Sequence, residues 1–400
     1  MAEQSQPVLR TDWQQWLTDR LYDPKSRGVV FQLLVVLALV WLGYEIVTNT
    51  IENLERQGIT SGFGFLDRTA GFDISQKLIS YQTTSTYGRA FLVGLMNTLL
   101  VAVIGIVVAT VVGFVVGIAR LSNNKLIQFL ATVFVELIRN IPPLLMLFFI
   151  YFGVLKNLPQ PRDSIALPMS SVLNVRGLYV PSPVWGDGSA LVLVALVAGL
   201  IAAVVAAMRA RAHRVATGEQ TPMLVRLLAM AIGPPLAVFA LMGFPLSFDV
   251  PAAGRFNVSG GLTIQPEFVA LVVGLSLYTA AFIAEIVRSG ILGVPNGQKE
   301  AAAALGLHDR QVMRFVVIPQ AMRIIIPPLT NQYLNLTKNS SLAVAIGYPD
   351  LVSVFGNTVL SQTNQAVEVI LIIMAVYLTI SLATSLLMNW FNRRMALVER

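Results

Sequence analysis

The sequence contains no cysteine and only two histidines, His213 and His308. Without cysteine there are no disulfides, thiolate zinc sites or iron–sulfur clusters, and two histidines are too few for a His-rich metal site. Charged residues are also scarce: they make up 12% of the 400 residues, about half of the ~25% usual in soluble domains. Hydrophobic residues reach 55%. This composition excludes disorder, collagen and coiled coil, and it predicts a protein whose solvent is the lipid bilayer.

Apolar segments long enough to cross a bilayer, which takes ~20 residues, recur along the chain. Two of them contain proline pairs, Pro142-Pro143 and Pro327-Pro328. We therefore predict an all-α integral membrane protein with about eight transmembrane helices. The predicted spans are residues 29–47, 91–118, 126–155, 190–208, 224–244, 268–291, 321–346 and 367–390.

The distribution of basic residues predicts the orientation of these spans. Eight spans place both termini on one side, and that side carries 18 of the 28 Lys and Arg residues. The opposite side carries seven, namely Arg56, Arg68, Lys77, Lys156, Arg162, Arg176 and Arg255. Because cytoplasmic connections carry the excess of Lys and Arg, we expect residues 1–28 and 391–400 to be cytoplasmic. The first residues are too acidic and too polar for a cleavable signal peptide.

The connections differ between the two sides. The cytoplasmic ones are short and basic, except for residues 292–320. The outer ones are long and rich in Gly, Pro, Ser and aromatic residues, and they cover residues 48–90, 156–189, 245–267 and 347–366.

The long cytoplasmic connection contains two predicted short helices joined by an elbow. Asn296 can cap the first helix, and Glu300 in its first turn suits the helix dipole. Gly306 can take the left-handed conformation that ends this helix. Asp309 can cap the second helix, which Pro319 then ends. Such an elbow is either a knob that enters a groove on a cytoplasmic partner or an amphipathic connector on the membrane surface.

This elbow resembles the "EAA" loop of ABC importer permeases. Glu300-Ala301-Ala302 is followed by Gly306 six residues after the glutamate, and by Pro319 thirteen residues after the glycine. Three further stretches are similar to the polar amino acid branch of that family, most of all to its general L-amino-acid (Aap/Bzt-type) permeases. They are Glu136-Leu-Ile-Arg139-Asn-Ile-Pro-Pro143, residues 278–290 and the polar run 327–343.

The resemblance implies a type I ABC importer permease fold over residues 91–390, after an extra N-terminal helix at 29–47 and a periplasmic loop at 48–90. It implies a subunit of the bacterial inner membrane that translocates polar L-amino acids by alternating access. The implied partners are a second, similar permease, two ABC ATPase subunits and a periplasmic amino acid binding protein. Glu300, Ala301, Ala302, Gly306 and Pro319 would couple the chain to the ATPases.

The chain is expected to catalyse nothing itself and to bind no cofactor, metal or nucleic acid. No G-x-x-x-x-G-K-[ST] motif occurs in it. In the family that it resembles, ATP and Mg²⁺ are used by the partner ATPases.

A stripe of small residues marks the second predicted span. Gly105, Ala109, Gly113 and Gly117 recur every four residues, which places them on one helix face. This face is expected to pack closely against another helix, in this subunit or in a sister permease. Contact with the substrate is the alternative.

Charged groups inside the spans are functional hypotheses by default. Glu136 and Arg139 lie three residues apart, as do Glu285 and Arg288, so each pair can share a helix face. The simpler interpretation is two self-neutralised pairs at the membrane interface.

Lys338 lies in the most polar stretch of any predicted span, beside Asn335, Asn339, Ser340 and Ser341. This stretch either lines a hydrated pathway that accepts the carboxylate of an amino acid, or forms a hydrogen-bonded knot between helices. In the first case, Tyr278 and Thr279 could contribute from the preceding span.

Two other function classes fit less well. A secondary transporter driven by an ion gradient would need a carboxylate relay, and the spans contain few mid-membrane carboxylates. An integral-membrane enzyme would need a cluster of reactive side chains, which the composition does not supply.

Overall fold

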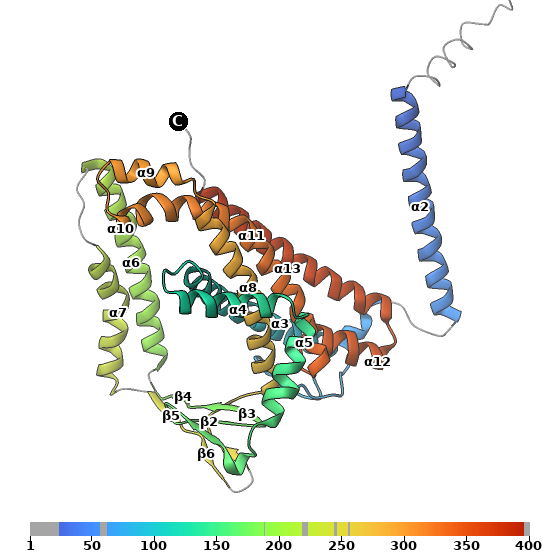
Figure 1. Cartoon of the computed structure of the whole chain (residues 1–400). Coiled ribbons are helices and arrows are strands. Elements are labelled where there is room, and N and C mark those ends of the chain that lie inside the picture. Colours follow the sequence, from blue (N-terminus) through green and yellow to red (C-terminus); the bar gives the residue numbers. More distant parts are fainter. Residues whose placement is uncertain are drawn as a thin grey trace, which may run out of the picture.

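The computed structural model of the chain describes residues 24–56, 62–187, 189–217, 223–243, 246–254 and 257–395. Long helices run between its two ends (Figure 1). One end carries two short helices, α9 (Asn296–Ala304) and α10 (Asp309–Val312), and the other end carries all the strands. Most of the predicted cytoplasmic N-terminus and the last five residues of the predicted tail lie outside the described residues.

All eight predicted spans lie on helices. Within the described residues, six helices are long and apolar enough to cross a membrane, or seven if a bent pair is counted as one span. The segment Val225–Leu241 is a further apolar helix, but it is shorter than these. The predicted spans begin on the helices α2 (Pro24–Arg56), α3 (Tyr87–Ala119), α4 (Lys125–Arg139), α6 (Ser189–Thr217), α7 (Leu224–Leu241), α8 (Pro266–Leu292), α11 (Ile318–Asn339) and α13 (Ala366–Met395).

The third predicted span is broken at its proline pair. α4 ends at Arg139, and the following helix starts at Pro143 with α5 (Pro143–Phe148), at an angle of 108° to α4. A proline disfavours helical geometry in the residue before it, yet suits the first position of a new helix. α5 continues through a π-helical turn (Phe149–Val154) towards the strands.

The seventh predicted span begins earlier than expected. α10 passes directly into a π-helical turn (Met313–Val317) and then into α11, so the chain is helical from Asp309 to Asn339. The prediction that Pro319 ends the second short helix is therefore wrong. Pro319 is the second residue of α11, directly after the π-helical turn. α11 ends in a 3-10 helix (Ser340–Ile346).

Among the described residues, two hydrophobic cores hold the central helices together. The larger core lies between α3, α8 and α11 and includes the fully buried side chains of Leu275, Ile283 and Leu336. The smaller core surrounds Phe65 and Phe355, near the start of α3. It joins a 3-10 helix (Phe63–Asp67), a π-helical segment (Val352–Val359), α12 (Leu360–Thr363) and α13. α2 stands apart from both cores and is exposed along its length (Figure 1).

Two predicted outer loops contain strands that the sequence did not reveal. A four-stranded antiparallel sheet has the order β1-β2-β3-β8, and β4-β5 and β6-β7 form two-stranded pairs. Leu178 of β3 pairs with Ile264 of β8, so the two loops form one cap. Each strand is only two to four residues long, too short for a visible alternation of apolar and polar residues. The strands are β1 (Ile165–Leu167), β2 (Ser171–Asn174), β3 (Gly177–Val180), β4 (Ser182–Trp185), β5 (Leu246–Asp249), β6 (Ala252–Ala253), β7 (Val258–Ser259) and β8 (Leu262–Ile264).

Candidate functional site

The predicted elbow forms a compact knob, made of α9, the turn 305–308 and α10. Gly306 has φ +80°, the left-handed conformation that its position was expected to need. The N–H of Gly306 donates to the carbonyl of Ala303 at 2.9 Å, and the N–H of Leu307 donates to that of Ala302 at 3.2 Å. These two bonds define a Schellman motif, which satisfies the last carbonyls of α9 and turns the chain sharply.

Both short helices begin one residue earlier than predicted, at the residues that were expected to be their N-caps. α9 begins at Asn296 with Pro295 as its N-cap, and α10 begins at Asp309 with His308 as its N-cap. The predicted caps Asn296 and Asp309 are therefore wrong, and so is the predicted place of Glu300 in the first turn, because Glu300 is the fifth residue of α9. The backbone N–H of His308 donates to Oε1 of Gln311 at 3.0 Å. The side chain of Gln311 thus satisfies the N–H of the N-cap residue, as in a capping box.

The knob presents one face to solvent and buries the other. Glu300 and Ala301 are exposed, whereas Ala302 is buried and belongs to the main core. Leu305, immediately before the left-handed glycine, is 82% exposed. Sequence reasoning did not single out Leu305, although an apolar residue at the tip of a polar elbow was a usable signal.

The knob is fixed to two membrane helices. Only three residues separate the end of α8 from α9, and α10 runs into α11 without a break. Gln320 of α11 donates to Gln298 of α9 at 3.3 Å, which ties the two arms together. A push on the knob therefore acts directly on α8 and α11.

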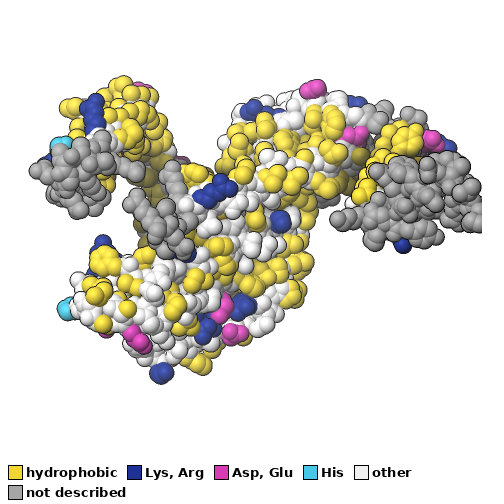
Figure 2. Space-filling view, turned by 90° about the horizontal axis from the view of Figure 1, so that it is seen from above, with side chains coloured by type: hydrophobic (Ala, Val, Ile, Leu, Met, Phe, Trp, Pro, Cys, Tyr) yellow, Lys and Arg dark blue, Asp and Glu magenta, His cyan; other side chains and the backbone are white. Residues whose placement is uncertain are grey.

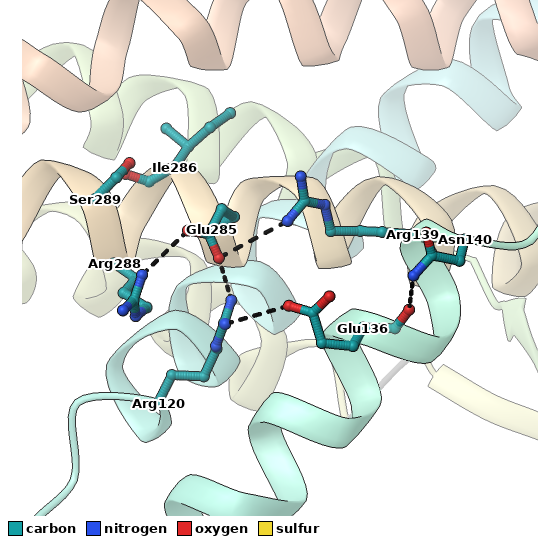
Figure 3. Close-up of polar contacts among 8 residues, drawn as sticks. All are labelled: Arg120, Glu136, Arg139, Asn140, Glu285, Ile286, Arg288 and Ser289. Carbon is teal, nitrogen blue, oxygen red and sulfur yellow. Dashed lines mark hydrogen bonds and ion pairs between the residues drawn. The ribbon is translucent and has the colours of Figure 1, made fainter.

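A cluster of five charged side chains lies between the ends of three helices, two turns before α8 reaches the knob (Figure 3). Glu285 of α8 is its centre. It pairs with Arg120, which caps the end of α3, with Arg139 at the end of α4 at 3.9 Å, and with Arg288 at 3.2 Å. Arg120 also reaches Glu136 of α4 at 3.6 Å. The charge cluster thus joins α3, α4 and α8.

The structure changes one of the two predicted ion pairs. Glu285 and Arg288 do pair on α8. Glu136 is placed against Arg120 rather than Arg139, and Arg139 turns to Glu285 and to the ring of Phe282, 5.3 Å away. Apart from the Glu285–Arg288 pair, the charges therefore neutralise one another between helices. Arg120, which the sequence placed in an ordinary connection, is the most buried member, with 7% of its side chain exposed.

The small residues of α3 face α8 and α11. A Cβ at Gly113 would lie 2.6 Å from Cβ of Ile283, and one at Gly117 would lie 2.8 Å from the carbonyl oxygen of Ala284. A Cβ at Gly105 would meet only the flexible end of Leu336, at 3.1 Å. Ala109 is fully buried in the same stripe. The stripe therefore packs inside this subunit.

This geometry predicts a sharp difference between two alanine substitutions. Gly113→Ala is expected to destabilise the chain by about 1–3 kcal/mol, the usual cost of overpacking, because both its neighbours belong to α8. Gly105→Ala is the matched control and is expected to be mild, since the Leu336 side chain can move. The measurement is the midpoint of thermal unfolding in detergent. Equal midpoints for the two variants would contradict the packing argument.

Lys338 is exposed and lies at a cavity of about 530 Å³. This volume is within the range of small-molecule sites. The lining combines one cation and three hydroxyl groups with apolar side chains, and it is formed by Lys338, Ser341, Val352, Ile373, Met374, Tyr377, Leu378 and Ser381. Asn335 is exposed one turn before Lys338 on α11.

The other predicted pathway residues are dispersed. Tyr278 and Thr279 lie on α8, which contributes no residue to the lining of this cavity, and Thr279 is buried. Ser340 is fully buried and donates to the carbonyl of Thr337 at 2.7 Å, while Ser341 donates to that of Lys338 at 2.7 Å. These two hydroxyls thus satisfy their own helix where it tightens into the 3-10 segment. Asn339 is partly exposed.

Asp350 is a buried carboxylate that sequence reasoning did not select. It accepts from the backbone N–H of Ser353 at 2.8 Å, and Tyr377, which lines the Lys338 cavity, donates to it at 3.5 Å. The segment around Asp350 is clamped onto α3: Asn97 donates to the carbonyl of Pro349 at 2.8 Å, and Leu351 donates to Thr98 at 3.0 Å. The clamp gives a structural reason for the two polar residues Asn97 and Thr98, which lie about three turns into the apolar helix α3.

Fold and site together define a multi-pass membrane protein whose central helices are tied to an exposed knob at one end. Comparison of its sequence with known families shows to which class of membrane protein it belongs. The chain belongs to the family described as "Binding-protein-dependent transport system inner membrane component", whose profile matches residues 195–397. The match covers the knob and the charged end of α8, together with α11 and α13.

Relatives extend the similarity over the whole chain. The general L-amino acid transport system permease protein AapQ of Rhizobium johnstonii is 54% identical over 100% of this chain and 99% of its own length. YhdX of Escherichia coli (strain K12) is 52% identical over 94% and 96%. The glutamate/glutamine/aspartate/asparagine transport system permease protein BztB of Rhodobacter capsulatus is 39% identical over 95% and 96%.

Proposed function

We propose that the chain is the membrane-spanning permease subunit of an ATP-driven importer of polar L-amino acids. The observation that carries the proposal is the knob: a rigid, exposed elbow fused to α8 and α11, on a chain that is 54% identical to a general L-amino acid permease protein. A secondary transporter driven by an ion gradient has no use for such an elbow.

The mechanism follows from how the knob is attached. A cytoplasmic ATPase that closes on ATP would move the knob through Glu300 and Leu305, and so displace the end of α8. Glu285 on that end would pull on α3 through Arg120 and on the bent helix α4 through Arg139. The helices would then rock around a central pathway, as alternating access requires. Ala301, Ala302, Gly306 and Pro319 would shape and hold the coupling surface.

The proposed assembly needs further subunits. A second, similar permease would complete the pathway, two ATPase subunits would bind ATP and Mg²⁺, and a periplasmic binding protein would deliver the amino acid to the strand cap. This chain would itself bind no cofactor. The excess of basic residues on the knob side supports a bacterial inner-membrane location with both termini in the cytoplasm. A protease-accessible tag after Arg400 in intact spheroplasts would overturn that orientation.

Uptake measurements test the function. Vesicles reconstituted with the chain and its co-purified subunits are expected to accumulate a labelled polar L-amino acid only when ATP is hydrolysed. Accumulation should persist when ionophores collapse the ion gradients. Uptake that survives without ATP at a constant ion gradient would support the secondary transporter and contradict the proposal.

Lys338 carries a separate prediction. If its ammonium group meets the carboxylate of the substrate in the cavity, Lys338→Met should raise KM by about 10- to 100-fold, the worth of one hydrogen bond to a charged group. Assembly and basal ATPase activity should be unchanged. Lys338→Arg keeps the charge and should recover part of the loss. Lost assembly with an unchanged KM would show instead that Lys338 holds helices together.

A further inference from the structure

α6 and α7 form a hairpin beside the bundle of α3, α8 and α11 (Figure 1). The two helices pack closely on each other: a Cβ at Gly199 would lie 2.7 Å from the carbonyl oxygen of Met230. Large apolar side chains such as Val197, Ile201 and Leu236 are exposed on the hairpin. The proposed transport mechanism uses none of these residues.

A groove runs between the two helices at the end where the knob lies. Its volume is about 930 Å³. The lining is apolar except for three basic side chains, and it consists of Ala198, Ile201, Ala202, Val205, Ala206, Arg209, Ala210, His213, Met223, Arg226 and Met230. The part of α6 from Ala198 to Arg209 spans about 16 Å at 1.5 Å per residue, roughly one leaflet of a ~30 Å hydrocarbon core.

The basic side chains gather at one end of the groove. Arg209 and His213 lie four residues apart on α6, so they share a helix face, and Arg226 lies in the first turn of α7. Figure 2 looks down on this end of the molecule, where Lys/Arg and His side chains lie beside the mainly hydrophobic lobe at the upper left. No acidic residue is among the lining residues.

The start of α7 adds to the positive potential there. Its first turn contains no acidic residue, and its N-cap, Met223, makes no side-chain cap bond. The first N–H groups of a helix and its dipole both favour an anion. The groove therefore combines two arginines and a helix N-terminus with a long apolar wall. These features suit a ligand that has a negatively charged head and a hydrocarbon chain.

We propose that this groove holds an anionic phospholipid of the leaflet on the knob side. Its phosphate lies between Arg209 and Arg226, and one acyl chain follows the alanine-rich wall of α6 from Ala206 towards Ala198. A free phosphate would not need the apolar wall. An apolar helix of a partner subunit would leave the arginines without a counter-charge. Basic pockets between helices at the cytoplasmic side of a membrane suit acidic headgroups.

Native mass spectrometry tests this proposal. The full-length chain, with any co-purified subunits, is incubated with equal amounts of dioleoyl phosphatidylglycerol and dioleoyl phosphatidylcholine in detergent. We expect preferential retention of phosphatidylglycerol. Each cation near a membrane surface is worth about fivefold in binding, so Arg209→Gln/Arg226→Gln should weaken retention about 25-fold. The matched control is Arg27→Gln/Arg393→Gln, which removes two exposed arginines from the ends of α2 and α13 and should leave retention unchanged.

A second variant tests the apolar wall without changing charge. Ala202→Leu/Ala206→Leu fills the groove with residues that favour helix, and it should lower phosphatidylglycerol retention while the elution profile of the protein stays the same. Equal retention of the two lipids, or full retention by the arginine double variant, would overturn the proposal. Unchanged retention by the leucine variant would contradict the proposed place of the acyl chain along α6. None of these readouts depends on transport.

Discussion

Glu285→Gln is expected to destabilise the chain by about 3 kcal/mol, at the lower end of the cost of breaking a buried ion pair because 29% of the side chain is exposed. The substitution keeps the size of the side chain and removes the carboxylate that pairs with all three arginines of the charge cluster, Arg120, Arg139 and Arg288. Arg120, which is almost fully buried, would keep only its 3.6 Å contact with Glu136.

The measurement is the temperature at which half of the protein is lost from the monodisperse peak in size-exclusion chromatography. Glu136→Gln is the matched control, since Glu136 belongs to the same cluster but is 56% exposed and makes one ion pair. Its cost should be at most ~1 kcal/mol. Similar losses for the two variants would contradict the central place of Glu285 in the cluster.

Features that depend on local sequence could be predicted well. A membrane span is defined by its own composition, so all eight predicted segments lie on helices. The left-handed Gly306 followed from its place at the end of an alanine run, because the strain of a positive φ selects glycine wherever it occurs. The proline pairs show the limit of this reasoning. One breaks a span, whereas Pro327 and Pro328 lie inside α11.

Features that depend on distant residues could not be predicted. Arg120 is separated from Glu285 by 165 residues, and spacing along the sequence suggested only the neighbours three residues away. The pairing of β3 with β8 likewise joins two loops that flank the α6–α7 hairpin. The Asp350 clamp is of the same kind, since its partners on α3 lie about 250 residues earlier. A single sequence contains no signal for such contacts.

Gly306→Val is expected to lower amino acid uptake strongly while leaving the chain inserted in the membrane. A Cβ at Gly306 would meet no atom within 4 Å, so the cost arises from its φ of +80° alone. A β-branched residue in this region costs about 1–3 kcal/mol. Because α10 is anchored through α11, the strain is relieved at the knob, and the Schellman turn that aims Leu305 opens. The proposed ATPase partner would then meet a misplaced surface.

Two further variants distinguish the effect of backbone strain at residue 306 from the effect of adding a side chain to the knob. Gly297→Val also adds a valine in open space on the knob, but at a residue of α9 without a positive φ, and it should retain uptake. Gly306→Asn should be intermediate, since asparagine adopts the left-handed conformation more readily than valine. The readouts are labelled amino acid uptake and the amount of ATPase that co-purifies with the tagged chain. A strain of 1–3 kcal/mol corresponds to a loss of about 5- to 150-fold in correctly shaped knobs, so co-purification should fall for Gly306→Val and stay for Gly297→Val. Normal uptake by Gly306→Val would refute a coupling role for the knob.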